Sequence, residues 1–147
     1  MAGINPYRVQ QRIADYAKTV LKEPIFEGGV PSPETIVRDG NGNIRPYVVM
    51  RFSDVSRDYR GNSMAGPRLD SYYGFCDFVC VAADDRTARA VSGNVMDKMT
   101  GFTPEEGGPF TKVGGGGEFT ILDGRDKPAA YVSITGYRYA LNYDLQT

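Results

Sequence analysis

Two adjacent carboxylates, Asp84 and Asp85, follow the apolar run FVCVAA and precede RTARAVSGNVMDKM. Paired carboxylates can hold Mg²⁺ or Ca²⁺, which prefer oxygen ligands. An aspartate at such a junction also caps a helix and complements the positive charge of its first turn. A single turn supplies few oxygen ligands, and no calcium-loop spacing follows. The sequence therefore favours helix capping over a metal site.

Four consecutive glycines, Gly114–Gly117, invite comparison with a phosphate-binding loop. Such a loop follows a strand, precedes a helix, and usually ends in Lys-Ser or Lys-Thr. Here the glycines precede the apolar segment 118–122, and Lys112 lies before them. A hinge or a close backbone contact explains the run better than nucleotide binding. We expect no cofactor.

The sequence contains no histidine, the side chain best suited to proton transfer near neutral pH. Ser–His and Cys–His nucleophilic sites are thereby excluded, as are zinc sites that use histidine. Asp77 interrupts an apolar segment at an inward position, where an unpaired carboxylate is costly. We expect Asp77 to pair with Arg51, Arg138 or an arginine of another chain. No partner base or nucleophile is identified, so no catalytic residue is assigned.

The composition is that of a soluble globular domain, with 147 residues of which 41% are hydrophobic and 24% charged. One domain spanning 1–147 is expected. The 17 basic and 18 acidic residues give a net charge of -1, so no overall basic field favours nucleic acid. No apolar run approaches the roughly 18 residues of a membrane span, and the N-terminus lacks the apolar core of a signal peptide. Cys76 and Cys80 are expected to be reduced.

Two amphipathic helices are predicted. The first starts at Asn5-Pro6, a capping residue followed by proline at the first helical position, and ends before Pro24. The second starts at Asp84 or Asp85 and ends at Gly101. Their apolar stripes are Val9, Ile13, Tyr16, Ala17, Val20 and Leu21 in the first and Ala88, Val91, Val95 and Met99 in the second.

Strands are predicted at 34–38 and 44–54, joined by a tight turn at 39–43 (DGNGN). Segment 72–82 is apolar on both faces, which is typical of a central strand covered on both sides, by helices or by a neighbouring subunit. Residues 103–117 are predicted to form a Gly-rich loop, followed by a short strand at 118–122.

The last strand, 129–143, has two contrasting faces. Its even positions, through Ile134, are small and aliphatic and suit packing beneath a helix. Its odd positions are rich in tyrosine, whose amphipathic ring is common in protein interfaces. We predict that this side lies in an interface, through Tyr131, Tyr137, Tyr139 and Tyr143.

Residues 54–71 (DVSRDYRGNSMAGPRLDS) are too long for an ordinary connector and are predicted to form a β-arm or loop. Contact with a partner is favoured over simple flexibility. Basic and aromatic side chains together can bind single-stranded nucleic acid. Interspersed aspartates cancel the charge here, so contact between subunits is favoured. The predicted contact residues are Arg57, Tyr59, Arg60 and Arg68.

The order of elements predicts an α+β fold: a mostly antiparallel, four- to five-stranded sheet with two helices packed on it. The long β-arm or loop, 54–71, lies between central strands, and the Gly-rich loop 103–117 follows the second helix.

The pattern resembles the tail terminator (tail completion) proteins of long-tailed phages with non-contractile tails. The resemblance rests on NPYRVQQRIADYAKTVL, YVVMRFSDV, the arm and the terminal strand AAYVSITGYRYAL. It rests also on YYGFCDFVCVAADDRTARAVSGNVMDKMTGF, in which an aromatic strand ending in Val-x-Ala enters Asp-x-x-x-Ala and a helix closed by Gly-Phe. Together these segments cover most of the chain.

The resemblance implies a ring, usually of six subunits, that caps the tail tube, stops its polymerisation and docks the head–neck connector. DNA passes through the hole without being read. The family has no enzymatic activity, and no catalytic residue can be carried over; we expect no metal or cofactor in this chain. The implied place is the head-proximal end of the tail in the virion, after synthesis in the host cytoplasm. Alternatives are another head–tail connector or tail tube protein and, more remotely, a small histidine-free enzyme using a carboxylate or tyrosine.

Overall fold

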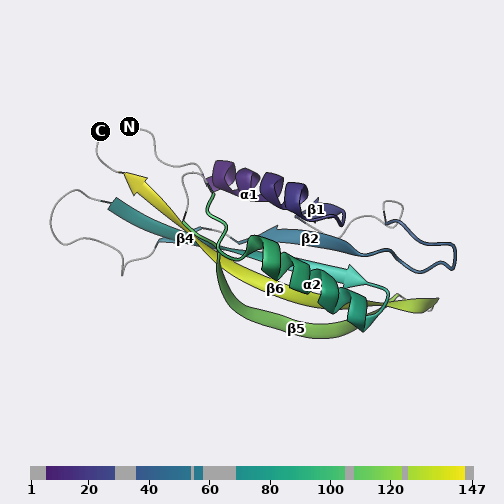
Figure 1. Cartoon of the computed structure of the whole chain (residues 1–147). Helices are drawn as coiled ribbons and strands as arrows, with labels where there is room; N and C mark the ends of the chain where they lie inside the picture. The colour runs from purple at the N-terminus through teal and green to yellow at the C-terminus, as the bar shows by residue number, and fades with distance from the viewer. Residues whose placement is uncertain are drawn as a thin grey trace.

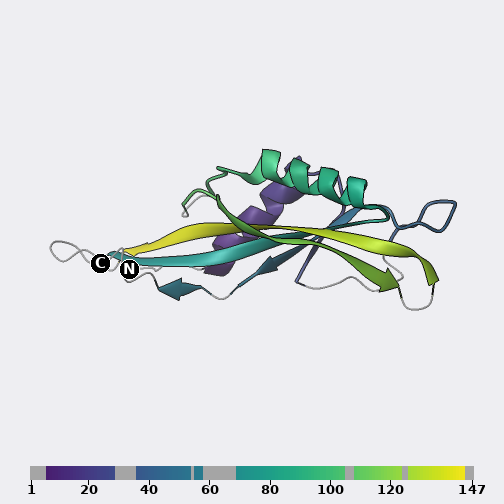
Figure 2. The ribbon, with the colours of Figure 1, turned by 90° about the horizontal axis from the view of Figure 1, so that it is seen from below.

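Two helices lie on one face of a single sheet (Figures 1 and 2). This computed structural model describes residues 6–28, 36–53, 55–57, 69–104, 108–123 and 126–144. The elements are α1 (Pro6–Val20), β1 (Ile25–Glu27), β2 (Tyr47–Phe52), β3 (Ser56–Arg57), β4 (Leu69–Ala82), α2 (Asp85–Met99), β5 (Thr111–Asp123) and β6 (Asp126–Asp144). The predicted α+β class, with two helices on a mostly antiparallel sheet, is confirmed.

The strand order in the sheet is β1-β2-β4-β6-β5, and β3 pairs with β4 outside this path. All pairs are antiparallel except β1 with β2. β4 and β6 are the long central strands, paired from Leu69 opposite Asp144 to Ala82 opposite Tyr131. Segment 72–82 is therefore central, as predicted. The short strands β1 and β3 were not predicted, because two or three residues carry too little pattern to be recognised.

The start of α2 is a helix cap, as predicted. The Asp84 side chain accepts hydrogen bonds from the backbone N–H of Thr87 at 2.8 Å and from the Thr87 hydroxyl at 2.9 Å. These two bonds hold the pKa of Asp84 below its ordinary value. After the helix, Gly101 takes the left-handed conformation with φ 83°.

The tight turn at 39–43 is confirmed, but the strands beside it are shorter than predicted. The Asp39 N–H donates to the Asn43 carbonyl at 2.8 Å, and Gly42 has φ 83°. Of residues 36–38, the described part of the strand predicted at 34–38, only Arg38 pairs, in an isolated bridge to Ile44, so that prediction is wrong for this part. The strand predicted at 44–54 is reduced to β2.

The Gly-rich loop predicted at 103–117 is wrong from Thr111 onward, because β5 starts there and runs through the glycines. Val113 lies opposite Gly136, whereas Gly117 lies opposite Ile134, so β5 contains two extra residues between these pairs. Glycine tolerates the backbone geometry of such a bulge without ending the strand.

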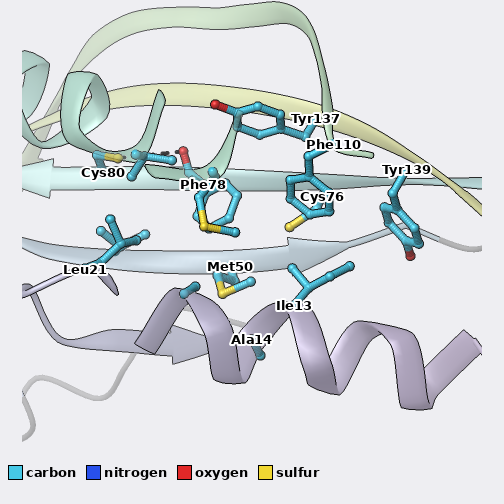
Figure 3. Packing of buried hydrophobic residues seen from close by; sticks show 14 of the residues in the cluster. Ile13, Ala14, Leu21, Met50, Cys76, Phe78, Cys80, Phe110, Tyr137 and Tyr139 are labelled. Carbon is cyan, nitrogen blue, oxygen red and sulfur yellow. Dashed lines mark hydrogen bonds between the residues drawn. The ribbon is translucent and has the colours of Figure 1, made fainter. Parts of the chain in front are cut away.

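The helix-facing side of β6 is its tyrosine side, which reverses the prediction for this strand. Tyr137 and Tyr139 are fully buried in the core, and the Phe110 ring stacks on both at centroid distances of 5.3 and 5.9 Å (Figure 3). The Tyr137 hydroxyl is 2.8 Å from the Thr100 hydroxyl, and Gln10 Nε2 donates to the Tyr139 hydroxyl at 3.0 Å. The rings fill core volume while the hydroxyls are satisfied beside the two helices.

The two cysteines are free, buried core residues of β4, as predicted (Figure 3). Burial raises the pKa of the Cys80 thiol to about 12 and that of Cys76 well above its ordinary value. Neither thiol is therefore an activated nucleophile at neutral pH.

Replacing Tyr137 or Tyr139 by Ser is expected to destabilise the fold by about 3–5 kcal/mol, because each change empties a large buried volume. The matched change to Phe keeps the ring and removes one hydrogen bond, so about 1 kcal/mol is expected. Chemical denaturation measures both. Serine variants as stable as the Phe variants would show that the rings are not core.

The ring of Tyr139 lies against the backbone of Gly74, and a Cβ there would come within 2.6 Å of the tyrosine hydroxyl. Gly74→Ala is therefore expected to destabilise the fold by about 1–3 kcal/mol. Gly93→Ala, on the open side of α2 with nothing within 4 Å, should instead stabilise it by roughly 0.5–1 kcal/mol. Thermal melting that ranks the two variants in the opposite order would refute this packing.

Candidate interaction surface

The sheet has a second face, opposite the helices, that no helix of the described residues covers (Figure 2). We call it the open face. The register places on it alternate residues of the central strands: Tyr73, Phe75, Asp77, Val79 and Val81 of β4 and Val132, Ile134, Gly136, Arg138 and Ala140 of β6. The even side of β6, predicted to pack beneath a helix, is therefore the side turned away from both helices.

One end of the open face is covered by the chain itself. Tyr47, Val49, Val81 and Val132 form a small buried cluster there. Ile36 and Ile44, which flank the tight turn, pack against this cluster together with Phe26 of β1. The covered end explains why β4 and β6 are apolar on this side near Val81 and Val132.

The other end of the open face carries an aromatic group with charged neighbours. Phe75 is 38% exposed, although it is a large apolar side chain on a central strand. Its ring meets that of Tyr73 edge to face at 5.6 Å, and the Arg138 guanidinium lies 4.5 Å from the centre of the Tyr73 ring. We call Tyr73, Phe75 and Arg138 the Phe75 patch. Aromatic residues and arginine are the side chains enriched at the energetic centres of protein interfaces.

A loose ion pair lies beside the Phe75 patch. Arg51 Nη2 and Asp77 Oδ2 are 3.9 Å apart, and both side chains are about half exposed. The predicted pairing of Asp77 with Arg51 is confirmed. The predicted inward position of Asp77 is wrong, because alternation along β4 turns it to the open face. At this distance and exposure the pair contributes little to stability, so both groups can make further contacts.

The described residues among those predicted for the interface do not lie together on one surface. Tyr137 and Tyr139 lie in the chain's own core, so their assignment to a subunit contact is wrong. Tyr131 is half-buried. The strands β3 and β6 include the backbones of Arg57 and Tyr143, whose side chains are outside the description, and Tyr59, Arg60 and Arg68 fall outside the described residues. The Phe75 patch was missed, since the sequence pattern does not say which side of β4 the helices cover.

The sheet narrows toward one end of the molecule. β2 stops pairing with β4 at Phe52 opposite Cys76, and β5 stops pairing with β6 at Thr111 opposite Arg138. β4 and β6 continue together to Leu69 and Asp144, and Figure 1 shows them extending past the helices. We call this part the β4–β6 ribbon. The described parts of the predicted arm, 54–71, include strand at both ends: Ser56 and Arg57 pair with Tyr73 and Tyr72, and β4 starts at Leu69.

A shallow groove of about 410 Å³ lies at the opposite, covered end. Its lining is mainly apolar and includes Phe26, Ile36, Val37 and Tyr47, together with the charged Lys22, Glu23 and Arg45. Residues 29–35, which connect β1 to Ile36, fall outside the described residues. The groove therefore carries no functional assignment.

Three further observations bear on function. Within the described ranges, no three His, Cys, Asp or Glu side chains are grouped as a metal ion would require. No helix in the described part of the chain is long and apolar enough to cross a membrane. No protein-family model matches the sequence, and no curated protein matches it significantly.

Proposed function

We propose that this chain is a structural virion protein, a tail terminator that assembles into a ring of six subunits. The ring caps the tail tube of a long-tailed phage with a non-contractile tail, ends its polymerisation, and joins the tail to the head–neck complex. Its partners are copies of itself, the tail tube protein and the head–neck connector. The observation that carries the proposal is that the two helices cover only one face of the sheet, although the central strands have apolar side chains on both faces.

The open face is the first support for assembly. Burying apolar surface contributes roughly 25 cal/mol per Å², so a half-exposed aromatic group on a central strand is a source of association energy. In this chain α1 and α2 cover only one side of β4 and β6. A neighbouring copy placed over the Phe75 patch would bury it and would bring a partner to Arg51 and Asp77.

The β4–β6 ribbon is the second support. A closed ring uses head-to-tail contacts, which need two different complementary surfaces on every subunit. We assign the two contacts to the Phe75 patch and to the outer end of the ribbon, where 69–71 pair with 142–144; the ribbon extends beyond the helical layer (Figure 1). Permanent subunit contacts often bury more than about 2,000 Å² in total, which a projecting element helps to supply.

The charge balance fits a ring through which DNA moves. A net charge of -1 gives no overall attraction to the phosphate backbone, so DNA can pass without sequence-specific binding. The proposal assigns no catalytic residue, cofactor or metal. It places the protein at the head-proximal end of the tail.

Phe75→Glu is expected to prevent ring formation while leaving the fold intact, because it puts a charge into the proposed contact and the side chain is already partly exposed. Met96→Glu is the matched control, since Met96 on α2 has a similar exposure of 40% and lies in the helical layer. Size-exclusion chromatography and circular dichroism of both variants test this. Rings of unchanged size from Phe75→Glu, or equal loss in both variants, would contradict the assigned face.

Capping distinguishes a terminator from another connector or tube protein of the same virion. Added to polymerising tail tube protein, the ring is expected to shorten the tubes in proportion to its amount. Electron microscopy of tube lengths measures the effect, and the Phe75→Glu variant serves as the inactive control. Tubes that grow without limit at saturating amounts of ring would count against termination and favour a connector.

A further inference from the structure

The tight turn at 39–43 contains Asn41 followed by Gly42. Neither the fold nor the proposed function depends on a reaction of this dipeptide. We infer that Asn41 is a site of spontaneous deamidation, by which the chain modifies itself without an enzyme. This inference does not depend on the proposed function.

The surroundings of the turn leave the reacting groups accessible. Asn41 and Gly42 are both exposed. Beyond the adjacent residues, a Cβ built on Gly40 or on Gly42 would meet nothing within 4 Å, so the turn has open space beside both glycines. Gly42 has φ 83°, a conformation that other residues adopt only with strain. The turn therefore requires at position 42 the one residue that leaves the nitrogen unhindered.

A cation lies at the peptide that follows the reacting one, on the far side of Gly42. Arg38 Nη1 donates a hydrogen bond to the Gly42 carbonyl at 2.9 Å. A nearby positive charge favours the deprotonated, anionic form of a group, and the attacking species here is the Gly42 nitrogen without its proton. The Gly42 N–H donates to the Asp39 carbonyl at 3.1 Å, so that one exposed hydrogen bond must open first. Local openings of exposed turns require little free energy.

The reaction balances without an oxidant or a second substrate. The deprotonated Gly42 nitrogen attacks Asn41 Cγ, a C–N bond forms, and the bond from Cγ to Nδ2 breaks. Ammonia leaves with the proton it needs, and a five-membered succinimide remains. Water then opens the ring at either carbonyl, which gives aspartate or isoaspartate. The sum is one amide and one water converted into one carboxylic acid and one ammonia.

The product would disturb the turn. Asp39 Oδ1 now accepts hydrogen bonds from the Asn41 N–H at 2.9 Å and from the Asn43 N–H at 3.0 Å. Isoaspartate routes the main chain through the former side chain, and either product adds a carboxylate close to that of Asp39. Ile44 follows directly and packs on the covered end of the open face, so the modified chain should hold that end less firmly.

The test is a time course of the intact purified chain at mildly alkaline pH, followed by peptide mapping with mass spectrometry. Asn94 is the internal control, because it is also exposed but lies within α2 and precedes the β-branched Val95. Asn41 is expected to lose its amide roughly ten-fold faster than Asn94 or more, with a rate that rises with pH and a mixture of isoaspartate and aspartate. Arg38→Gln should slow the loss several-fold.

Two outcomes would overturn the inference. One is that Asn41 in the folded chain deamidates no faster than Asn94 but does deamidate in denaturant. That result would show that the folded turn protects Asn41. The other is a product containing aspartate alone, which would indicate direct hydrolysis rather than attack by Gly42. Asn41→Gln should remove the signal and serves to assign the mapped peptide.

Discussion

The packing of Tyr137 and Tyr139 against Phe110 determines how this chain covers its sheet. The three stacked rings lie between the central strands and the helices, and the two hydroxyls reach Gln10 beside α1 and Thr100 after α2. Because both rings point to the helical side, β6 turns its smaller side, including Ile134 and Gly136, to the open face. The same alternation directs Phe75 of β4 away from the core. The exposed aromatic group is thus a consequence of the buried ones.

A sheet with this asymmetry offers a simple basis for assembly. The helical layer completes one side of the domain, and the turn at 39–43 completes one end of the other side through Ile36 and Ile44. The rest of the open face carries the Phe75 side chain, two arginines (Arg51 and Arg138) and the Asp77 carboxylate, which is loosely paired with Arg51. The proposed ring uses this surface as one of its two contacts and the outer end of the β4–β6 ribbon, 69–71 with 142–144, as the other. Assembly then needs no change in the core.

Much of the fold could be predicted from local patterns, whereas the face of the sheet that the helices cover could not. The caps of α2, the turn at 39–43 and the central position of β4 follow from short-range spacing and turn chemistry; the predicted cap Asn5 of α1 lies outside the described residues. Period-two alternation groups Tyr137 with Tyr139 but does not say which side faces the helices, since both sides of β6 contain apolar residues. Tyrosine was assigned to an interface because its ring is amphipathic, and here its hydroxyl is satisfied internally. The glycines at 114–117 suggest a loop, because composition cannot show that β5 continues through them with a bulge and pairs with β6 on both sides of it.

The central claim is that copies of this chain cover one another's open face in a closed ring. Native mass spectrometry of the purified chain over a range of concentrations tests it most directly. The account predicts one dominant species of six subunits, with few intermediates because each added contact favours closure. A mass that remains that of a single chain at high concentration, alone and beside tail tubes, would contradict it.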